Sequence, residues 1–204
     1  DIGPHPAHLV HGDAVITERC GHLNVAIHPK SFYQTNSLQA EHLYGVVRDW
    51  LDASGTETLL DLYCGIGSIG LFVADRVKNV VGVETVEPAV ERAVENAELN
   101  GISNVRFLAG DVRELLAETG SAARPDIVVL DPPRAGVHPK VIDQLISLAP
   151  RQIVYVSCKP STQARDLAAL AEYYEVTRMQ PVDMFPQTFH IENVADLRRK
   201  EKPE

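Results

Sequence analysis

Two polar side chains in the second half of the chain have the types and the setting that covalent catalysis requires. Cys158 lies in the segment Ser157-Cys158-Lys159-Pro160, directly after an apolar run, and Glu192 ends the segment FPQTFHIE. A cysteine thiolate is a strong nucleophile and a usable leaving group, and a carboxylate within reach can remove a proton from the adduct. The pair therefore suits addition of a thiol to an electron-poor carbon, followed by proton abstraction and release of the thiol.

The thiol of Cys158 needs neighbours that favour its ionised form, because a free cysteine has a pKa of about 8.5. We expect that role for Arg134, in the segment DPPRAG that begins at Asp131, and for the backbone NH groups that open the helix after Cys158. The two prolines predict an extended loop beside a ligand cleft. His190 is a second, weaker candidate base or else a structural histidine, and with Arg134 it is expected to position the substrate.

A glycine-rich segment indicates a site for a nucleotide-type cofactor. Gly65, Gly67 and Gly70 follow an apolar run with the spacing G-x-G-x-x-G, and Glu84 comes about 20 residues later. The glycines let the backbone approach a ligand, and the carboxylate can hold a ribose diol. The spacing alone leaves the cofactor open, and the nicotinamide cofactor of an oxidoreductase remains an alternative.

Two further acids bear on the identity of the cofactor. Asp61, at the end of the first apolar run, is unfavourable beside an anionic pyrophosphate but suits the cationic amino-acid end of S-adenosylmethionine. Asp111, after the third run, is placed either to reach an adenine amino group or to cap a helix. S-adenosylmethionine is therefore the predicted cofactor.

Apolar runs and helical patterns alternate from residue 57 onward. Strands are predicted at 58–63, 79–84, 105–110, 126–131 and 152–158, and helices at 68–77, 87–100, 111–119, 138–148 and 161–171. Two more strands, near 173–179 and 189–197, are joined by a proline-containing link without a helix. This order predicts an α/β fold: a Rossmann-like, doubly wound sheet of the methyltransferase type, mostly parallel, with an antiparallel pair at its edge. The chemistry-bearing segments then fall at the carboxyl ends of strands, where such sheets bind ligands.

The first part of the chain has a different pattern. Short strands are predicted at 9–16 and 23–28, on either side of a glycine-containing turn. A helix is predicted from an N-cap at Ser37 up to Gly55.

The composition limits the classes of protein that fit. The chain has 204 residues, 45% of them hydrophobic, and no apolar run approaches the roughly 18 residues of a membrane span. Its three cysteines are widely spaced and odd in number, which argues against a disulfide framework and for a reducing, cytoplasmic setting. The net charge of -9 weighs against nucleic-acid binding. Residues 131–166, however, hold five basic and three acidic side chains, a local balance of +2.

These segments together resemble the RNA (uracil-5-)-methyltransferase family, which modifies ribosomal and transfer RNA. The matching segments, in the family's order, are SFYQTN, LLDLYCGIG, VVGVE, VVLDPPRAG, YVSCKPSTQARD and DMFPQTFHIE. They extend from residue 31 to about 198, and the Ser-Cys-x-Pro and Phe-Pro-x-Thr-x-His-x-Glu segments are the family's own signatures. The resemblance implies the C-terminal catalytic domain of such an enzyme.

The resemblance implies roles that spacing alone does not assign. Cys158 takes the position of the family's nucleophile and Glu192 that of its base. The residues expected to bind the cofactor, from the glycine motif and the resemblance together, are Gln34, Tyr63, Gly65, Ser68, Glu84, Asp111 and Asp131. Ser68 and Asp111 fall at positions that vary in the family. Lys159 stands where asparagine is common and Gln187 where histidine is common, and neither change removes a catalytic atom.

The implied reaction is transfer of a methyl group from S-adenosylmethionine to C5 of a uridine. Cys158 adds to C6 of the base, C5 takes the methyl group, and Glu192 removes the C5 proton. The first candidate substrate is a uridine of 23S ribosomal RNA, and the second is the T-loop uridine of transfer RNA. In either RNA the base must leave its stack to reach the thiol. Two rivals of other classes remain: an NAD-dependent oxidoreductase, and an RNA-binding module without catalysis.

The resemblance also implies what lies outside this chain. Family members usually have an N-terminal OB-like RNA-binding domain, a central domain and often four cysteines that hold an iron–sulfur cluster. We interpret residues 1–30 as a hairpin left from the central domain and residues 31–204 as the methyltransferase domain, so a cluster is expected only in a missing N-terminal region. We expect a monomer, and its histidines show no spacing typical of a metal site.

Overall fold

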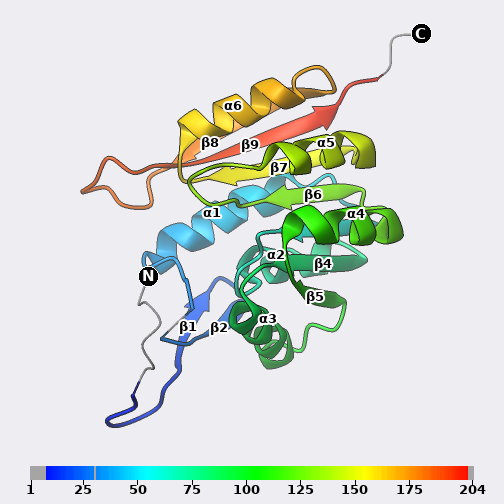
Figure 1. Ribbon diagram of the computed structural model, residues 1–204. Coiled ribbons are helices and arrows are strands. Elements are labelled where there is room, and N and C mark those ends of the chain that lie inside the picture. Colours follow the sequence, from blue (N-terminus) through cyan, green and yellow to red (C-terminus); the bar gives the residue numbers. More distant parts are fainter. Residues whose placement is uncertain (1–7, 30, 202–204) are drawn as a thin grey trace.

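The computed structural model describes residues 8–29 and 31–201, and its centre is a seven-stranded sheet (Figure 1). The strands are β3 (Thr58–Leu62), β4 (Asn79–Glu84), β5 (Val105–Ala109), β6 (Ile127–Leu130), β7 (Gln152–Ser157), β8 (Tyr174–Val182) and β9 (Glu192–Arg199). They lie in the order β5-β4-β3-β6-β7-β9-β8. The first five are parallel neighbours, so their carboxyl ends meet at one edge of the sheet.

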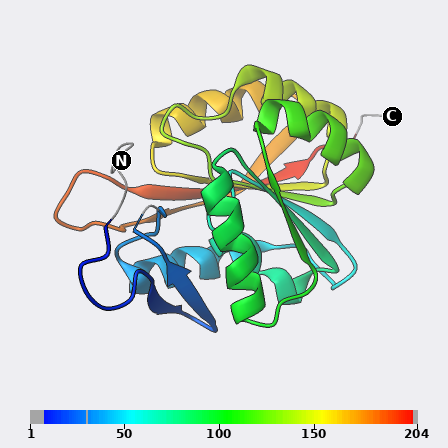
Figure 2. The ribbon, with the colours of Figure 1, turned by 60° about the horizontal axis from the view of Figure 1, so that its bottom comes forward.

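Helices cover both faces of this sheet, as Figure 2 shows. On one face lie α1 (Ser37–Trp50), α2 (Ser68–Phe72) and α3 (Glu87–Leu99), and on the other α4 (Val112–Ala123), α5 (Pro139–Leu148) and α6 (Pro160–Leu170). Each helical layer forms its own apolar cluster with the sheet. All four side chains of β6 are fully buried, as expected for a strand between two helical layers. The predicted doubly wound α/β fold is confirmed.

The predicted antiparallel edge pair is confirmed, with one refinement. β9 lies between β7 and β8 and is antiparallel to both, so β8 runs in the same direction as β7. The register pairs Ser157 with Asn193 and Val182 with Glu192. The start of β9 therefore lies at the edge where β7 ends.

The predicted strand at 9–16 is wrong. The hairpin strands are β1 (Ile16–Cys20) and β2 (Leu23–Ile27), and residues 9–15 form no strand. Leu9 and Val10 are exposed, so their apolar character does not mark a buried strand.

Two predicted ends of α1 are also wrong. The N-cap is Asn36, whose Oδ1 accepts a hydrogen bond from Gln39 N at 3.2 Å, whereas the Ser37 hydroxyl donates to Glu18. The helix ends at Trp50 rather than at Gly55, because Leu51 has an extended backbone.

The predicted helix at 68–77 is α2 followed by the short 3-10 helix η1 (Ala74–Arg76).

The hairpin of β1 and β2 shares its core with the helical layer of α1. Cys20, Leu23 and Val25 are buried in the same apolar cluster as that helix. The fully buried Asn96 of α3 accepts a hydrogen bond from Ala26 N at 2.7 Å. The assignment of residues 1–30 to a preceding central domain stays a prediction, and residues 1–7 and 30 lie outside the described residues. None of the helices in the described part of the chain combines the length and apolar character needed to cross a bilayer.

Candidate active site

The carboxyl ends of the parallel strands gather most of the polar residues predicted for the site. The loop after β3 holds Tyr63 and Gly65, and β4 ends at Glu84. The loop after β6 begins at Asp131, and Cys158 directly follows β7. The order of the strands thus places the predicted cofactor residues at the ends of β3, β4 and β6 beside the predicted catalytic residue Cys158 at the end of β7.

The glycine-rich loop between β3 and α2 has an unusual backbone. Tyr63, Gly65 and Gly67 all have positive φ values, of 66°, 53° and 80°. A Cβ at Gly67 would lie 2.8 Å from the Phe107 ring, so only glycine fits without movement of that ring. The NH groups of Tyr63 and Cys64 both donate to the carbonyl of Val83, which fixes the loop against β4.

Glu84 is held at this loop by two backbone hydrogen bonds. Its Oε2 accepts from Gly65 N at 3.0 Å, and its Oε1 accepts from Val86 N at 2.9 Å. The carboxylate therefore lies directly beside the glycine that begins the motif. This geometry suits recognition of a diol next to the loop.

Asp61 is fully buried under the same loop. Its Oδ2 accepts a hydrogen bond from Gly70 N at 2.9 Å, whereas no donor of the described residues reaches its Oδ1. Burial, and to a smaller degree the Glu84 carboxylate, raise the pKa of Asp61 to about 7, although the Gly70 NH opposes this. A buried acid with an unused acceptor atom is unusual and indicates a place for a hydrogen-bond donor or a cation.

The remaining predicted cofactor residues differ in their surroundings. Asp111 precedes α4, accepts a hydrogen bond from Arg113 N at 2.8 Å and pairs with the Arg113 guanidinium, which lowers the pKa of Asp111 to about 2. Asp111 thus caps its helix, and its contact with an adenine stays a prediction. Ser68 begins α2, and Gln34 is buried just before α1.

The catalytic candidates meet where β6, β7 and β9 come together. Glu192 begins β9 and is buried, with 6% of its surface exposed. Ser157 at the end of β7 pairs with Asn193 of β9. Cys158 comes directly after Ser157 and Glu192 directly before Asn193, so the thiol and the carboxyl group are at adjacent strand ends. Asp131, which was predicted to bind the cofactor, follows β6 and acts electrostatically on the same thiol.

Burial and neighbouring charges shift the pKa values of the residues in this group. Burial raises the pKa of Glu192 to about 7, although Arg134 lowers it. The pKa of Asp131 is raised well above its usual range by burial and by the carboxylates of Glu192 and Asp61. The group therefore holds several acids, with Arg134 as the cation that acts on Glu192.

The thiol of Cys158 responds to the same charges. Burial raises its pKa, and so do Glu192 and Asp131, whereas Arg134 and a backbone hydrogen bond lower it. Arg134 thus acts in the expected direction, but burial and the acids outweigh it. The backbone hydrogen bond is that of Cys158 itself, and a contribution from the NH groups that open α6 stays a prediction. Cys20 and Cys64 are the other free thiols, and both are buried.

Arg134 and His190, the two residues predicted to position the substrate, contact each other. Arg134 Nη2 lies 3.3 Å from His190 Nδ1, and the arginine is exposed beside the group of acids. Whether either side chain contacts a substrate stays a prediction.

The sequence did not predict a set of hydrogen bonds by which α6 fixes the loop after β6, which contains Arg134. Asp166 of α6, which is 3% exposed, accepts hydrogen bonds from Val137 N and from the Tyr155 hydroxyl, both at 2.8 Å. Arg165 donates to the carbonyl of Ala135 at 2.9 Å. The helix that follows Cys158 therefore also fixes the loop after Asp131. The adjacent Arg-Asp pair one turn beyond the Ser-Cys-x-Pro segment was the available signal.

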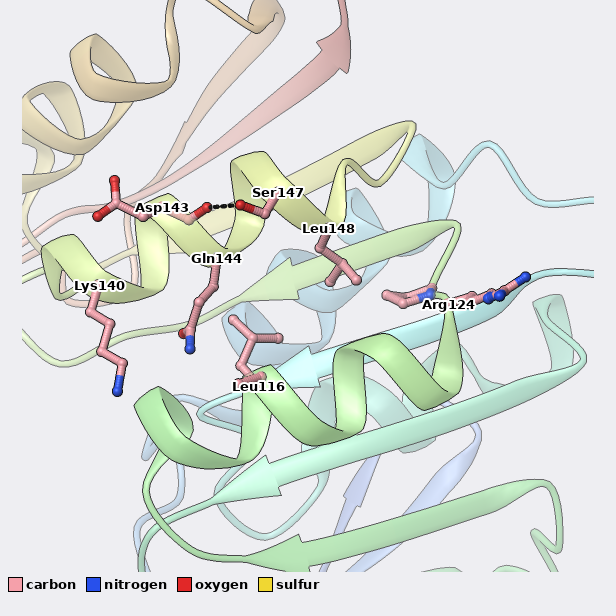
Figure 3. Close-up of a pocket in the computed structure, with 9 residues that line it drawn as sticks. Leu116, Arg124, Lys140, Asp143, Gln144, Ser147 and Leu148 are labelled. Atoms are coloured by element: carbon pink, nitrogen blue, oxygen red, sulfur yellow. Dashed lines mark hydrogen bonds between the residues drawn. The ribbon is translucent and has the colours of Figure 1, made fainter.

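A separate hollow of about 790 Å³ lies between α4 and α5 (Figure 3). Leu116 and Leu148 line it, with Lys140 and Arg124 near its two ends. It contains none of the predicted site residues. The candidate active site is therefore assigned to the strand ends.

The strand order and the glycine loop define a Rossmann-like methyltransferase fold. A tRNA m1G37 methyltransferase from Methanocaldococcus jannaschii has this fold, with a TM-score of 0.71 at 13% identity over 94% of this chain and 59% of that chain. The chain itself belongs to the tRNA (uracil-5-)-methyltransferase family, whose model matches residues 22–200.

Individual relatives are much more similar in sequence. An RNA methyltransferase of Porphyromonas gingivalis is 48% identical over 97% of this chain and 43% of its own length. The solved tRNA (uracil-54, C5)-methyltransferase of Pyrococcus abyssi, in complex with S-adenosyl-L-homocysteine, is 40% identical with a TM-score of 0.82. The match covers 92% of this chain and 45% of that chain. The chain thus spans less than half the length of these relatives.

The charges around Cys158 lead to a testable order of thiol reactivity. Glu192→Gln removes a negative neighbour and is expected to increase the rate of iodoacetamide alkylation of Cys158 at pH 8 by about 3- to 10-fold. Arg134→Ala removes a cation and is expected to decrease that rate by a similar factor. Mass spectrometry of the labelled peptide measures each rate, with the buried Cys20 and Cys64 as internal references. Equal rates in both variants would show that these charges do not act on the thiol.

Proposed function

We propose that this chain is the catalytic part of an S-adenosylmethionine-dependent enzyme that methylates C5 of a uridine in RNA. The observation that carries the proposal is the meeting of Cys158 and Glu192 at adjacent strand ends, in a member of the family described above. A thiol and a buried carboxyl group so close that the carboxylate raises the pKa of the thiol suit addition and proton abstraction at one base.

The residues at β3 and β4 fit the proposed cofactor. Glu84 lies beside the glycine loop, where it would hold the ribose hydroxyls, with Tyr63 and Gly65 next to it. The Oδ1 of Asp61, which has no partner among the described residues, favours a cationic amino-acid group nearby. The cofactor would supply an electrophilic methyl group bound to a sulfonium. The Pyrococcus relative was solved with the demethylated form of this cofactor, which supports the same assignment.

The mechanism assigns one task to each catalytic side chain. The Cys158 sulfur forms a bond to C6 of the uracil, and the electrons displaced from the C5–C6 double bond make C5 nucleophilic. After C5 has gained the methyl group, Glu192 takes the C5 proton, and the C6–S bond breaks to release the thiolate. A pKa of about 7 suits this task, because the carboxyl group is then partly ionised at neutral pH and still basic.

An RNA substrate fits the exposed cations at this edge of the sheet. Arg134, Lys140 and Lys159 are exposed and lie at the loop after β6 and at the first turns of α5 and α6. Phosphate contacts of this kind supply much of the affinity for nucleic acid. The target uridine would leave its stack to reach Cys158.

Two RNAs are candidates for the substrate. A uridine of 23S ribosomal RNA is the first candidate that the sequence motifs favour. A tRNA uridine is the second, and the 40% identity with the Pyrococcus tRNA enzyme supports it. The alternatives, an oxidoreductase or a non-catalytic RNA-binding module, do not explain why Cys158 and Glu192 lie at adjacent strand ends.

Cofactor binding tests the first half of the proposal. S-adenosylhomocysteine is expected to raise the melting temperature of the full-length protein, whereas NAD is not. Glu84→Gln removes a charged acceptor and is expected to weaken S-adenosylhomocysteine about 10- to 100-fold in calorimetry. Glu87→Gln, a change of an exposed acid three residues away, is the matched control and should bind normally. Stabilisation by NAD alone would contradict the assignment.

Methyl transfer to defined RNAs tests the substrate. The full-length protein, with radiolabelled S-adenosylmethionine, is expected to label unmodified 23S ribosomal RNA or unmodified tRNA transcripts, and nuclease mapping should find 5-methyluridine. Label in the ribosomal RNA alone supports the first candidate, and label in tRNA alone supports the second. Label at a base other than uridine would contradict the proposed reaction.

Covalent trapping tests the two catalytic residues. RNA with 5-fluorouridine at the target should form a stable adduct with the full-length protein, because the fluorine at C5 cannot be removed as a proton. Cys158→Ala should form no adduct, whereas Cys20→Ala, a change of a buried thiol in β1, should still form it. Glu192→Gln should form the adduct but turn over ordinary RNA about 10²- to 10⁴-fold more slowly. An unchanged adduct in Cys158→Ala would reject this nucleophile.

A further inference from the structure

The loop between β8 and β9, residues 183–191, presents an exposed aromatic side chain next to the candidate active site. This loop projects beyond the strand ends in Figures 1 and 2. Phe189 in it has 89% of its surface exposed. A single exposed apolar side chain is ordinary on a protein surface, so its exposure alone indicates nothing. The position of Phe189 is what distinguishes it.

Phe189 lies directly beside the residues proposed to handle the substrate. Its ring centroid is 4.3 Å from that of His190, at an interplanar angle of 47°. His190 in turn contacts Arg134, and Glu192 follows in the same segment. The phenylalanine is therefore at the rim of the site that holds the thiol and the carboxyl group.

The backbone of the loop is fixed, so the ring is presented from a defined place. The Thr188 hydroxyl donates to the carbonyl of Phe185 at 2.9 Å and accepts from His190 N at 3.2 Å. Asn36 Nδ2 donates to the carbonyl of Met184 at 3.0 Å, and Met184 is fully buried. These contacts hold the segment on both sides of Phe189.

Exposure alternates along the segment that leads into β9. Phe189 and Ile191 are exposed, at 89% and 37%, whereas His190 is half-buried and Glu192 is buried. The segment thus buries Glu192 in the site and leaves Phe189 and Ile191 exposed to solvent close to it.

We propose that Phe189 stacks on the nucleobase next to the target uridine. The inference rests on the proposed function. A uridine that leaves its stack exposes a face of each neighbouring base, and an aromatic ring can cover such a face whatever the base is. Together with Arg134, which contacts the adjacent His190, the ring would hold the RNA strand in place while the uridine occupies the site. Phe189 is thus a positioning residue for the substrate, without a part in the bond-making steps.

The first test separates binding from chemistry in the full-length protein. Phe189→Ala is expected to raise KM about 5- to 100-fold for the RNA transcript that the protein methylates, with kcat almost unchanged. Phe189→Trp should restore a KM near that of the unchanged protein. Tyr173→Ala is the matched control, because Tyr173 is also an exposed aromatic but lies before β8, at the opposite edge of the sheet.

The second test identifies the stacking partner. Transcripts are made with an abasic nucleotide directly before or directly after the target uridine. One of these two should bind the unchanged protein as weakly as Phe189→Ala binds the intact transcript, and should show no further loss with Phe189→Ala. Independent, additive losses at both positions would overturn the proposal.

Other outcomes also decide the matter. An unchanged KM in Phe189→Ala, or a fall in kcat alone, would overturn the stacking role. A lower melting temperature of Phe189→Ala without RNA, with normal RNA binding, would show instead that the ring packs on another part of the protein. If the protein methylates neither RNA, the proposed function fails. The affinity for a labelled oligouridine, measured by fluorescence anisotropy, still tests the role of Phe189. Equal affinities of the unchanged protein and Phe189→Ala for that oligouridine would then overturn the inference.

Discussion

The candidate site depends on the antiparallel register of β9 between β7 and β8. A shift of one residue would turn every side chain of β9 to the opposite face and would remove Glu192 from Cys158. The buried carboxylate of Asp196 helps to fix this register, because it accepts hydrogen bonds from Gln152 of β7 at 2.6 Å and from the Thr177 hydroxyl of β8 at 2.9 Å. A polar contact at the far part of the sheet thus supports the chemistry at the strand ends.

The same strand order concentrates acids where the cofactor and substrate regions meet. Burial raises the pKa of Asp61 and of Glu192 to about 7, and the pKa of Asp131 rises partly through both of these neighbours. Ionisation of Glu192 or Asp61 therefore disfavours ionisation of Asp131. A cation bound near Asp61 would ease ionisation of Asp131, so the two halves of the site are linked by charge as well as by position.

The sequence predicted the sheet and the meeting of the site residues because both follow from patterns along the chain. Apolar strands that alternate with helices require parallel pairing, and parallel pairing brings Glu84, Asp131 and Cys158 to one edge. The ends of elements were less predictable. Asn36 and Ser37 are both good caps, and only the contact of Ser37 with Glu18, distant in sequence, decides between them. The direction of the pKa shift of Cys158 could not be predicted either, because it depends on burial and on neighbours in space that the spacing of residues does not reveal.

The net charge of -9 and an RNA substrate are compatible because the charges are unevenly distributed. The exposed face of α3 carries four glutamates, and this helix lies on the sheet face opposite α5 and α6. The exposed Lys140 lies in the first turn of α5, and the exposed Lys159 directly precedes α6. The acids Asp61 and Glu192 are partly neutral near pH 7. With RNA as the proposed substrate, α3 would repel the phosphates, and the cations at the starts of α5 and α6 would attract them. That distribution favours one direction of approach to Cys158, over the side of the molecule that also holds Arg134.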